Sequence, residues 1–273
     1  MKKMNRKQKH QPQPRQPNQQ PKPSFWSTGN LPIAIAHRGG DAVGREKENT
    51  LKAFAAARKA GYKYGETDVI LSKDGQVVAV HGASNLWDSL LRRRHSRRRM
   101  QRMSLDKLRE KFSVDGEQIP TLEEVLVSQS QMKYFIDPKT DEVLEPLYVL
   151  LKRLNMLDRV CVGSFNYKRV ERFRELAGTQ PVHTSFIIGR AFRVVNKNKD
   201  MLKNSRVEGV EAIQLHHSLV SRQMLDLVHK QGFKAAVWTA NSEISIKNAI
   251  KCGADAIISD RIHLLKEVIQ SSR

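Results

Sequence analysis

The stretch YGETDVILSKDGQVVAVHG, residues 64–82, predicts two strands joined by a tight turn. Its first half is rich in β-branched and aromatic residues, and its last residues form a second extended run. Asp74-Gly75, between the two runs, is a strong signal for a two-residue hairpin turn. In the register that such a turn sets, His81 is expected to lie opposite Asp68.

The first strand of this hairpin also carries a pair of acids. Glu66 and Asp68 are two residues apart, so both side chains are expected on the same face of the strand. Carboxylates that close repel each other unless a proton or a metal ion lies between them. With His81 beside them, the hairpin predicts a cluster of two carboxylates and one imidazole.

Outward from the hairpin, extended and helical patterns alternate along the chain. The expected strands start near residues 33, 64, 133, 159, 181, 211, 233 and 256. Nearly all of them are followed by a helical pattern, which is typical of a (β/α)8 barrel of the α/β class, a TIM barrel. A doubly wound sheet is the alternative, and the lack of a glycine-rich GxGxxG turn disfavours it.

Basic residues are concentrated in two segments. The chain has 273 residues and a formal net charge of +20. Residues 1–30 and residues 92–102, RRRHSRRRMQR, each carry seven lysines or arginines and no acid, so together they account for +14 of that charge. The glutamine- and proline-rich stretch 1–30 is expected to be a disordered tail, and 31–273 a single barrel domain. Residues 82–118 are expected to form a small basic insert after the hairpin.

Several other classes of protein are disfavoured. The N-terminal segment has no apolar core of a secretory signal, and no run of apolar residues is long enough to span a membrane. The two cysteines, Cys161 and Cys252, have no spacing typical of a disulfide framework or a metal site. A cytoplasmic protein is therefore expected, and the oligomeric state stays open.

In a barrel of this kind, chemistry takes place where the strands end at their carboxyl side. The residues expected there are His37, Arg38, Glu66, Asp68, His81, Asp137, Lys139, His216, Trp238 and Asp260. Three of these carboxylates, Glu66, Asp68 and Asp137, suit one hard divalent cation, Mg²⁺ or Ca²⁺, better than zinc. The arginine and lysine favour an anionic group such as phosphate, and imidazoles can act as acid and base near pH 7. This set of groups suits metal-assisted phosphodiester cleavage.

The motifs and their order resemble the glycerophosphodiester phosphodiesterase family, whose members are phosphatidylinositol-phospholipase-C-like TIM-barrel enzymes. The matching stretches are IAHRGG (35–40), ENTLKAFAAARKAG (48–61), ETDVILSKDGQVVAVH (66–81), IPTLEEVL (119–126), AVWTAN (236–241) and GADAIISDR (253–261).

The resemblance implies roles for individual residues. It implies that His37 and His81 are catalytic, and that the metal ligands are Glu66, Asp68 and Asp137. It also implies that Arg38 and Lys139 bind the phosphate and that Trp238 packs on the glycerol part of the substrate. The implied reaction takes a small glycerophosphodiester and yields glycerol 3-phosphate and an alcohol.

This chain departs from the family pattern at three places. Asp137 stands where the family has a glutamate, Gly82 stands where an aspartate usually follows the second histidine, and DAVGREKENT (41–50) is longer and more charged than usual. Two alternatives to the expected activity follow. One is a lysophospholipid phosphodiesterase at a membrane, and the other is an inactive barrel that binds anionic polymers.

The basic segments have two candidate partners. An anionic membrane surface suits an enzyme with a lipid-derived substrate, and would make the protein peripheral to a membrane. Nucleic acid would also attract seven arginines. It is less favoured, because residues 92–102 contain no aromatic residue on which bases could stack.

Overall fold

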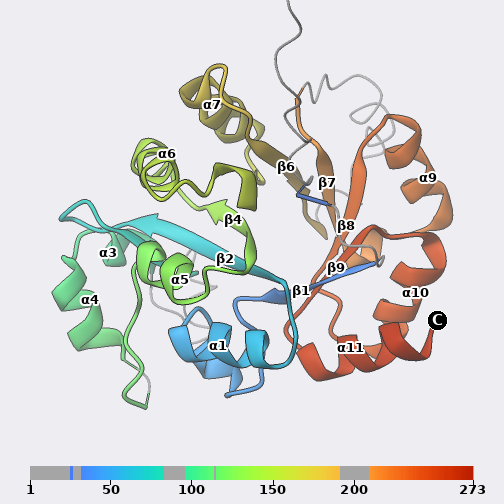
Figure 1. The fold of residues 1–273 in the computed structure, drawn as a ribbon, viewed down its shortest axis with the longest axis horizontal. Helices are drawn as coiled ribbons and strands as arrows, with labels where there is room; N and C mark the ends of the chain where they lie inside the picture. Colours follow the sequence, from blue (N-terminus) through green and yellow to red (C-terminus); the bar gives the residue numbers. More distant parts are fainter. Residues whose placement is uncertain (1–24, 27–31, 83–95, 114, 191–208, 273) are drawn as a thin grey trace, which may run out of the picture.

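The computed structural model describes residues 25–26, 32–82, 96–113, 115–190 and 209–272, and these form the barrel that the sequence predicts (Figure 1). Its parallel strands are β1 (Ile33–His37), β2 (Tyr64–Leu71), β4 (Lys133–Pro138), β5 (Val160–Ser164), β6 (His183–Ile188), β7 (Ala212–His216), β8 (Lys234–Trp238) and β9 (Ala256–Ser259). The ring closes because β1 pairs with both β9 and β2. The eight-stranded (β/α)8 architecture is thereby confirmed.

Helices surround the strands on the outside (Figure 1). They are α1 (Leu51–Lys59), α3 (Arg97–Met100), α4 (Leu105–Phe112), α5 (Leu122–Ser128), α6 (Leu144–Arg153), α7 (Tyr167–Ala177), α9 (Arg222–Lys230), α10 (Glu243–Cys252) and α11 (Ile262–Ser271). Within the described ranges there are three short 3₁₀ turns, η1 (Arg45–Lys47), η2 (Leu157–Arg159) and η4 (His217–Leu219). A helical stretch expected to end near Asn204 lies outside the described residues. None of the described helices has the length and apolar character needed to cross a bilayer.

Local sequence signals explain where two of the helices begin. Helix α5 starts with a capping box, in which the Thr121 hydroxyl and the Glu124 carboxylate satisfy each other's backbone N–H groups. Helix α1 is capped by Thr50, whose hydroxyl accepts a hydrogen bond from the Ala53 N–H, and not by the preceding Asn49. Asn49 has a left-handed backbone with φ 62°. Its side chain instead accepts a hydrogen bond from Thr67 in β2.

The register of the hairpin differs by one residue from the prediction. Strand β3 (Val77–Ala79) pairs antiparallel with β2, and Val69 lies opposite Ala79. The turn holds three residues instead of two, because Ser72 donates its N–H to the Gln76 carbonyl and Gly75 has φ 79°. The Val80 N–H, and not His81, therefore bonds to the Asp68 backbone.

The N-terminal segment was predicted to be disordered throughout, and this is wrong for two of its residues. Phe25 is fully buried and Trp26 is 9% exposed, and both pack among residues that start the barrel strands. The Phe25 ring meets Phe135 edge to face at a centroid distance of 5.1 Å. Its carbonyl accepts a hydrogen bond from Lys133 Nζ at 3.0 Å, and Trp26 Nε1 donates to Glu211. Burying these two aromatic side chains stabilises their packing on the barrel, although the sequence around them is polar.

The described part of the insert packs beside the β2–β3 hairpin (Figure 1). Helices α3 and α4 bury Met100, Leu108 and Phe112 against Ile70 and Val78 of the hairpin. The arginine run 92–102 is described from residue 96 onward, where Arg98 and Arg99 are exposed. Because α3 and α4 form a small core of their own on β2, they hold one wall of the barrel mouth in place.

Candidate active site

All eight side chains predicted for the site line one cavity of about 90 Å³ at the carboxyl ends of the strands; they are His37, Arg38, Glu66, Asp68, His81, Asp137, Lys139 and Trp238. Sheet register explains this convergence. His37 of β1 is paired with Glu66 of β2, and Asp68 of β2 is paired with Asp137 of β4. Residues at equivalent positions of neighbouring parallel strands lie side by side, so four of the eight meet without any contribution from loops.

His37 is held by an aspartate from the opposite end of the chain. Its Nδ1 lies 2.5 Å from Asp260 Oδ1, and its Nε2 lies 3.6 Å from Glu66 Oε2. Asp260 accepts a second hydrogen bond from Asn241 Nδ2 at 2.6 Å. Burial would raise the pKa of Asp260, but the hydrogen bond and charge of His37, the hydrogen bond from Asn241 and the charge of Arg38 together lower that pKa below its usual range. An ionised Asp260 keeps the proton of a neutral imidazole on Nδ1, which leaves Nε2 able to accept another.

The sequence placed Asp260 at a strand end but assigned it no role in the chemistry. The contact with His37 joins residues 223 positions apart, so no local pattern could reveal it. The one signal was that His37 ends one strand and Asp260 follows another, and that the two strands are neighbours in a closed barrel.

Arg38 connects two acidic residues at the mouth. Its Nε lies 2.7 Å from Asp68 Oδ2, and its Nη1 donates to Glu48 at 3.0 Å. Arg38 also has a left-handed backbone with φ 53°, which is uncommon for a residue other than glycine. Such a conformation is maintained only where surrounding contacts require it. Here the two ion pairs hold a buried guanidinium toward the cavity.

Lys139 lies between two of the predicted metal ligands, and its ammonium bonds to both Asp68 and Asp137. Burial would lower the pKa of Lys139, but these two carboxylates outweigh it and raise that pKa. Burial would likewise raise the pKa of Asp68, yet Arg38 and Lys139 hold it well below its usual range. Burial raises the pKa of Asp137, with Lys139 acting in the opposite direction.

At Glu66, burial and the charge of Asp68 outweigh the nearby positive groups. Burial, followed by the charge of Asp68, raises the pKa of Glu66 to about 7. Its buried Oε2 has no hydrogen-bond partner among the described residues. A buried carboxylate oxygen without a hydrogen-bond partner, close to the carboxylates of Asp68 and Asp137, has the donor chemistry of a hard-cation site. Even so, the described residues contain no group of three or more His, Cys, Asp or Glu side chains arranged to hold a metal ion.

His81 lies on the arm that returns from the hairpin, and it lines both this cavity and the wider mouth outside it. The strand ends at Ala79, so the one-residue change of register does not turn His81 away from the site. Gly82, which follows it, has φ 58°, and a Cβ there would lie 3.3 Å from the Arg97 Cα and the Met100 Sδ. A glycine at this position therefore lets helix α3 pack closely against the second histidine's loop.

An aromatic wall borders the cavity on the side of β5 and β8. The Trp238 ring meets Phe165 edge to face with a centroid distance of 5.3 Å. Lys139 Nζ lies 5.8 Å from the Phe165 centroid. Phe165, which is 48% exposed, was missed by the sequence analysis. It directly follows β5, and that position is the signal that could have identified it.

The small cavity opens into a mouth of about 640 Å³, lined by His37, His81 and His216 together with Arg38, Trp238 and Asp260. The cations Arg38 and Lys139, the imidazoles of His37 and His81 and a group of buried carboxylates thus face a space that a phosphodiester can enter. Cations suit the phosphate, and a histidine on each side suits proton transfer to and from its oxygens.

Comparisons with known proteins agree with this geometry. Residues 37–264 match the model of the "Glycerophosphoryl diester phosphodiesterase family". The chain is 29% identical over 255 residues to "Probable glycerophosphodiester phosphodiesterase 2" of Mycobacterium tuberculosis, which covers 87% of this chain and 90% of the relative. It is 28% identical over 246 residues to the "Glycerophosphodiester phosphodiesterase" of Caldanaerobacter subterraneus, covering 84% of this chain and 93% of the relative.

A solved structure shares the fold. The Oleispira antarctica phosphodiesterase, solved in complex with the product sn-glycerol-3-phosphate, superposes with a TM-score of 0.68 at 23% identity and covers 88% of this chain and 97% of its own. The match of the family model over most of the barrel, with the motif residues gathered in one cavity, shows that this chain belongs to the glycerophosphoryl diester phosphodiesterase family, a family of phosphoric diester hydrolases.

Proposed function

We propose that this chain hydrolyses small glycerophosphodiesters to glycerol 3-phosphate and an alcohol, with His37 and His81 moving the protons. The observation that supports this most strongly is the half-buried His37–Asp260 pair, which faces a cavity lined by all the other expected site residues. The product named for the Oleispira antarctica enzyme supports the same reaction.

The substrate phosphate would bind between Arg38 and Lys139. Both side chains are buried cations that line the cavity, and both are oriented by acidic partners. A guanidinium can give a phosphate two parallel hydrogen bonds, and an ammonium adds a compact charge. The glycerol part would pack on the wall formed by Trp238 and Phe165.

The two histidines would act on opposite oxygens of the phosphate. His37, with its Nδ1–H held by Asp260, takes a proton from the attacking water at Nε2. The water oxygen forms a new bond to phosphorus while the bond between phosphorus and the alcohol oxygen breaks. The departing oxygen keeps that electron pair and takes a proton from His81, so the alcohol leaves neutral.

One divalent cation, Mg²⁺ or Ca²⁺, would be held by Glu66, Asp68 and Asp137. When bound, it would supply positive charge that polarises a phosphoryl oxygen. The Lys139 ammonium bonds to two of these carboxylates and would compete with the ion for them. Asp137 is one methylene shorter than the family's glutamate. Because its carboxylate reaches less far toward the ion, competition from Lys139 would weaken its hold on the ion more.

The direct test is release of glycerol 3-phosphate from glycerophosphocholine, with and without a chelator. We expect hydrolysis that the chelator abolishes and that added Mg²⁺ or Ca²⁺ restores. Calorimetry of the Glu66→Gln and Asp68→Asn variants should show that each has lost divalent-ion binding. Unchanged metal affinity in both variants would show that the ligands are misassigned.

The same assay separates the two alternatives. An inactive barrel releases no glycerol 3-phosphate with either ion. A lysophospholipid phosphodiesterase cleaves lysophosphatidylcholine much faster than glycerophosphocholine. We expect the soluble diester to be the better substrate, because the described mouth is lined largely by polar and charged side chains.

A further inference from the structure

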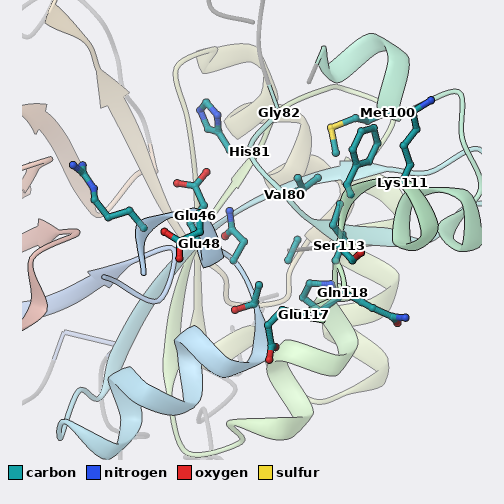
Figure 2. A pocket seen from close by; sticks show the side chains of 17 residues that line it. Glu46, Glu48, Val80, His81, Gly82, Met100, Lys111, Ser113, Glu117 and Gln118 are labelled. Atoms are coloured by element: carbon teal, nitrogen blue, oxygen red, sulfur yellow. The ribbon is translucent and has the colours of Figure 1, made fainter. Parts of the chain in front are cut away.

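A second cavity of about 470 Å³ lies beside the active site (Figure 2). Its walls come from the loop 45–50, the returning hairpin arm 79–82 and the insert between residues 100 and 120. We call it the insert chamber. Residues 45–47, Gly82 and residues 100–118 lie outside the stretches that match the family, whereas residues 48–50, 79–81 and 119–120 lie within them.

The insert chamber is continuous with the mouth of the active site. His81, Glu48 and Arg45 line both spaces, whereas Trp238 and Phe165 line only the active-site side. A phosphodiester has two organic arms on one phosphorus. If the glycerol arm packs on the aromatic wall, the other arm leaves past His81 and enters the chamber.

The chamber offers hydrogen-bonding groups of both kinds. Asn49 is only 3% exposed, and its Oδ1 accepts a hydrogen bond from Thr67. Its Nδ2 has no partner among the described residues, although it is buried. A buried donor without an acceptor carries a free-energy cost that a ligand oxygen would remove.

Acceptors come from acidic side chains. Glu46 forms no salt bridge within the described part of the chain, and Figure 2 shows it beside Glu48, close to His81. Glu117 lines the far end of the chamber, where its nearest cation, Lys52, is 3.8 Å away. Carboxylates accept hydrogen bonds and cannot donate them, so they suit ligand hydroxyl groups.

The remaining lining narrows the class of ligand. Val80, Met100 and Phe112 supply an apolar surface. An acyl chain would leave the acidic groups without water or partners, which is costly. A cationic alcohol would meet Arg45 and Lys111, which also line the chamber. A neutral molecule with several hydroxyls and an apolar C–H face avoids both penalties.

We propose that the insert chamber binds the leaving group of the diester and that this group is a neutral polyhydroxy alcohol, such as a cyclic polyol or a sugar. The proposal rests on the proposed hydrolysis, in which His81 protonates the departing oxygen. Asn49 donates to one hydroxyl oxygen, and Glu46 and Glu117 accept from others. A volume of about 470 Å³ is in the range that proteins use for ligands of this size.

The test compares kcat/KM for three soluble diesters: glycerophosphoinositol, glycerophosphocholine and the methyl ester of glycerol 3-phosphate. The wild-type protein should prefer glycerophosphoinositol over the methyl ester by about tenfold or more, because its hydroxyls pair with buried polar groups. The double variant Glu46→Ala/Glu117→Ala should reduce that preference by about tenfold. The matched control Glu110→Ala, an exposed acid on α4 outside the chamber, should leave the preference unchanged.

Each outcome is decisive. Equal rates for the three diesters, or a preference for glycerophosphocholine, would overturn the assignment of the leaving group while leaving the proposed hydrolysis intact. A preference that survives the double variant would overturn the roles of the two acids and the chamber. Failure to cleave any diester, with either ion present, would overturn the proposed hydrolysis and this inference together.

Discussion

Replacing Asp260 by asparagine tests the structure most sharply, because it changes one atom in a fully determined set of contacts. One carboxylate oxygen of Asp260 pairs with His37 Nδ1 at 2.5 Å, and the other accepts from Asn241 Nδ2 at 2.6 Å. An asparagine must direct its NH₂ group toward one of these two nitrogens. Toward Asn241, two donors would face each other.

Directed toward His37, the amide would donate to Nδ1 and move the imidazole proton to Nε2. That tautomer cannot accept a proton from water at Nε2. Loss of a hydrogen bond to a charged group alone costs about 1.5–3 kcal/mol, which corresponds to roughly 10- to 150-fold in rate. With the tautomer also wrong, we expect kcat for glycerol 3-phosphate release to fall by at least about 10²-fold.

The assay is kcat on glycerophosphocholine at saturating Mg²⁺ or Ca²⁺, with thermal unfolding to confirm that the variant is folded. Asp226→Asn, an exposed residue of α9 far from the site, is the matched control and should keep full activity. If the folded Asp260→Asn variant turned over within about threefold of the wild-type rate, Asp260 would not orient His37 and the assignment of His37 as base would lose its support.

Three further predictions concern the acid, the buried charge and the basic segments. His81→Ala should lower turnover of glycerophosphocholine by at least about 10²-fold. A diester with a good leaving group such as p-nitrophenol should recover most of the lost rate, because that group departs without a proton. Equal losses on both substrates would show that His81 is not the acid. The pKa of Glu66 is raised to about 7, so the folded protein holds a proton there that the unfolded chain has lost, and stability falls as the pH rises through 7. We therefore expect the free energy of unfolding of Glu66→Gln, measured with denaturant in the presence of a chelator, to rise relative to the wild-type protein by up to about 3 kcal/mol between pH 5 and pH 8. The exposed control Glu171→Gln should show no such trend. A difference between Glu66→Gln and wild type that stays constant with pH would contradict the raised pKa. Deleting residues 1–24 and changing the arginines of 92–102 to glutamine should leave turnover of soluble diesters within a few-fold of the wild-type rate. Salt-sensitive binding to anionic liposomes should weaken sharply, and binding to nucleic acid is measured beside it. Undiminished binding to both would show that the basic segments do not hold the protein at an anionic surface.

The barrel could be read from the sequence because its signals are local and repeated. Each strand is a short apolar run, and each neighbouring helix has an amphipathic pattern, in several cases with a capping residue such as Thr121. Parallel strands of a closed barrel bring their carboxyl ends to one rim, so residues that end separate strands had to meet there. His37, Glu66, Asp68 and Asp137 were predicted together for that reason.

Other features depend on contacts that no local pattern encodes. The three-residue turn at Gly75 shifted the register of the hairpin by one, since the difference between two turn types is small compared with the packing of the strands around them. Burial of Phe25 depends on a pocket to which distant strands contribute, among them β2 with Tyr64, which is 39 residues away. Only the folded barrel provides that pocket.

By itself, the sequence determined the alternation of strands and helices, the rim on which the chemistry lies and the types of side chain gathered there. The tertiary structure decided how those side chains are paired. It brings Asp260 within hydrogen-bond distance of His37 and sets Lys139 between Asp68 and Asp137. It also encloses the insert chamber between the loop 45–50 and helices α3 and α4. The physical reason is that hydrogen bonding and burial depend on distance in space, and the distance along the chain between such partners is as large as 223 residues.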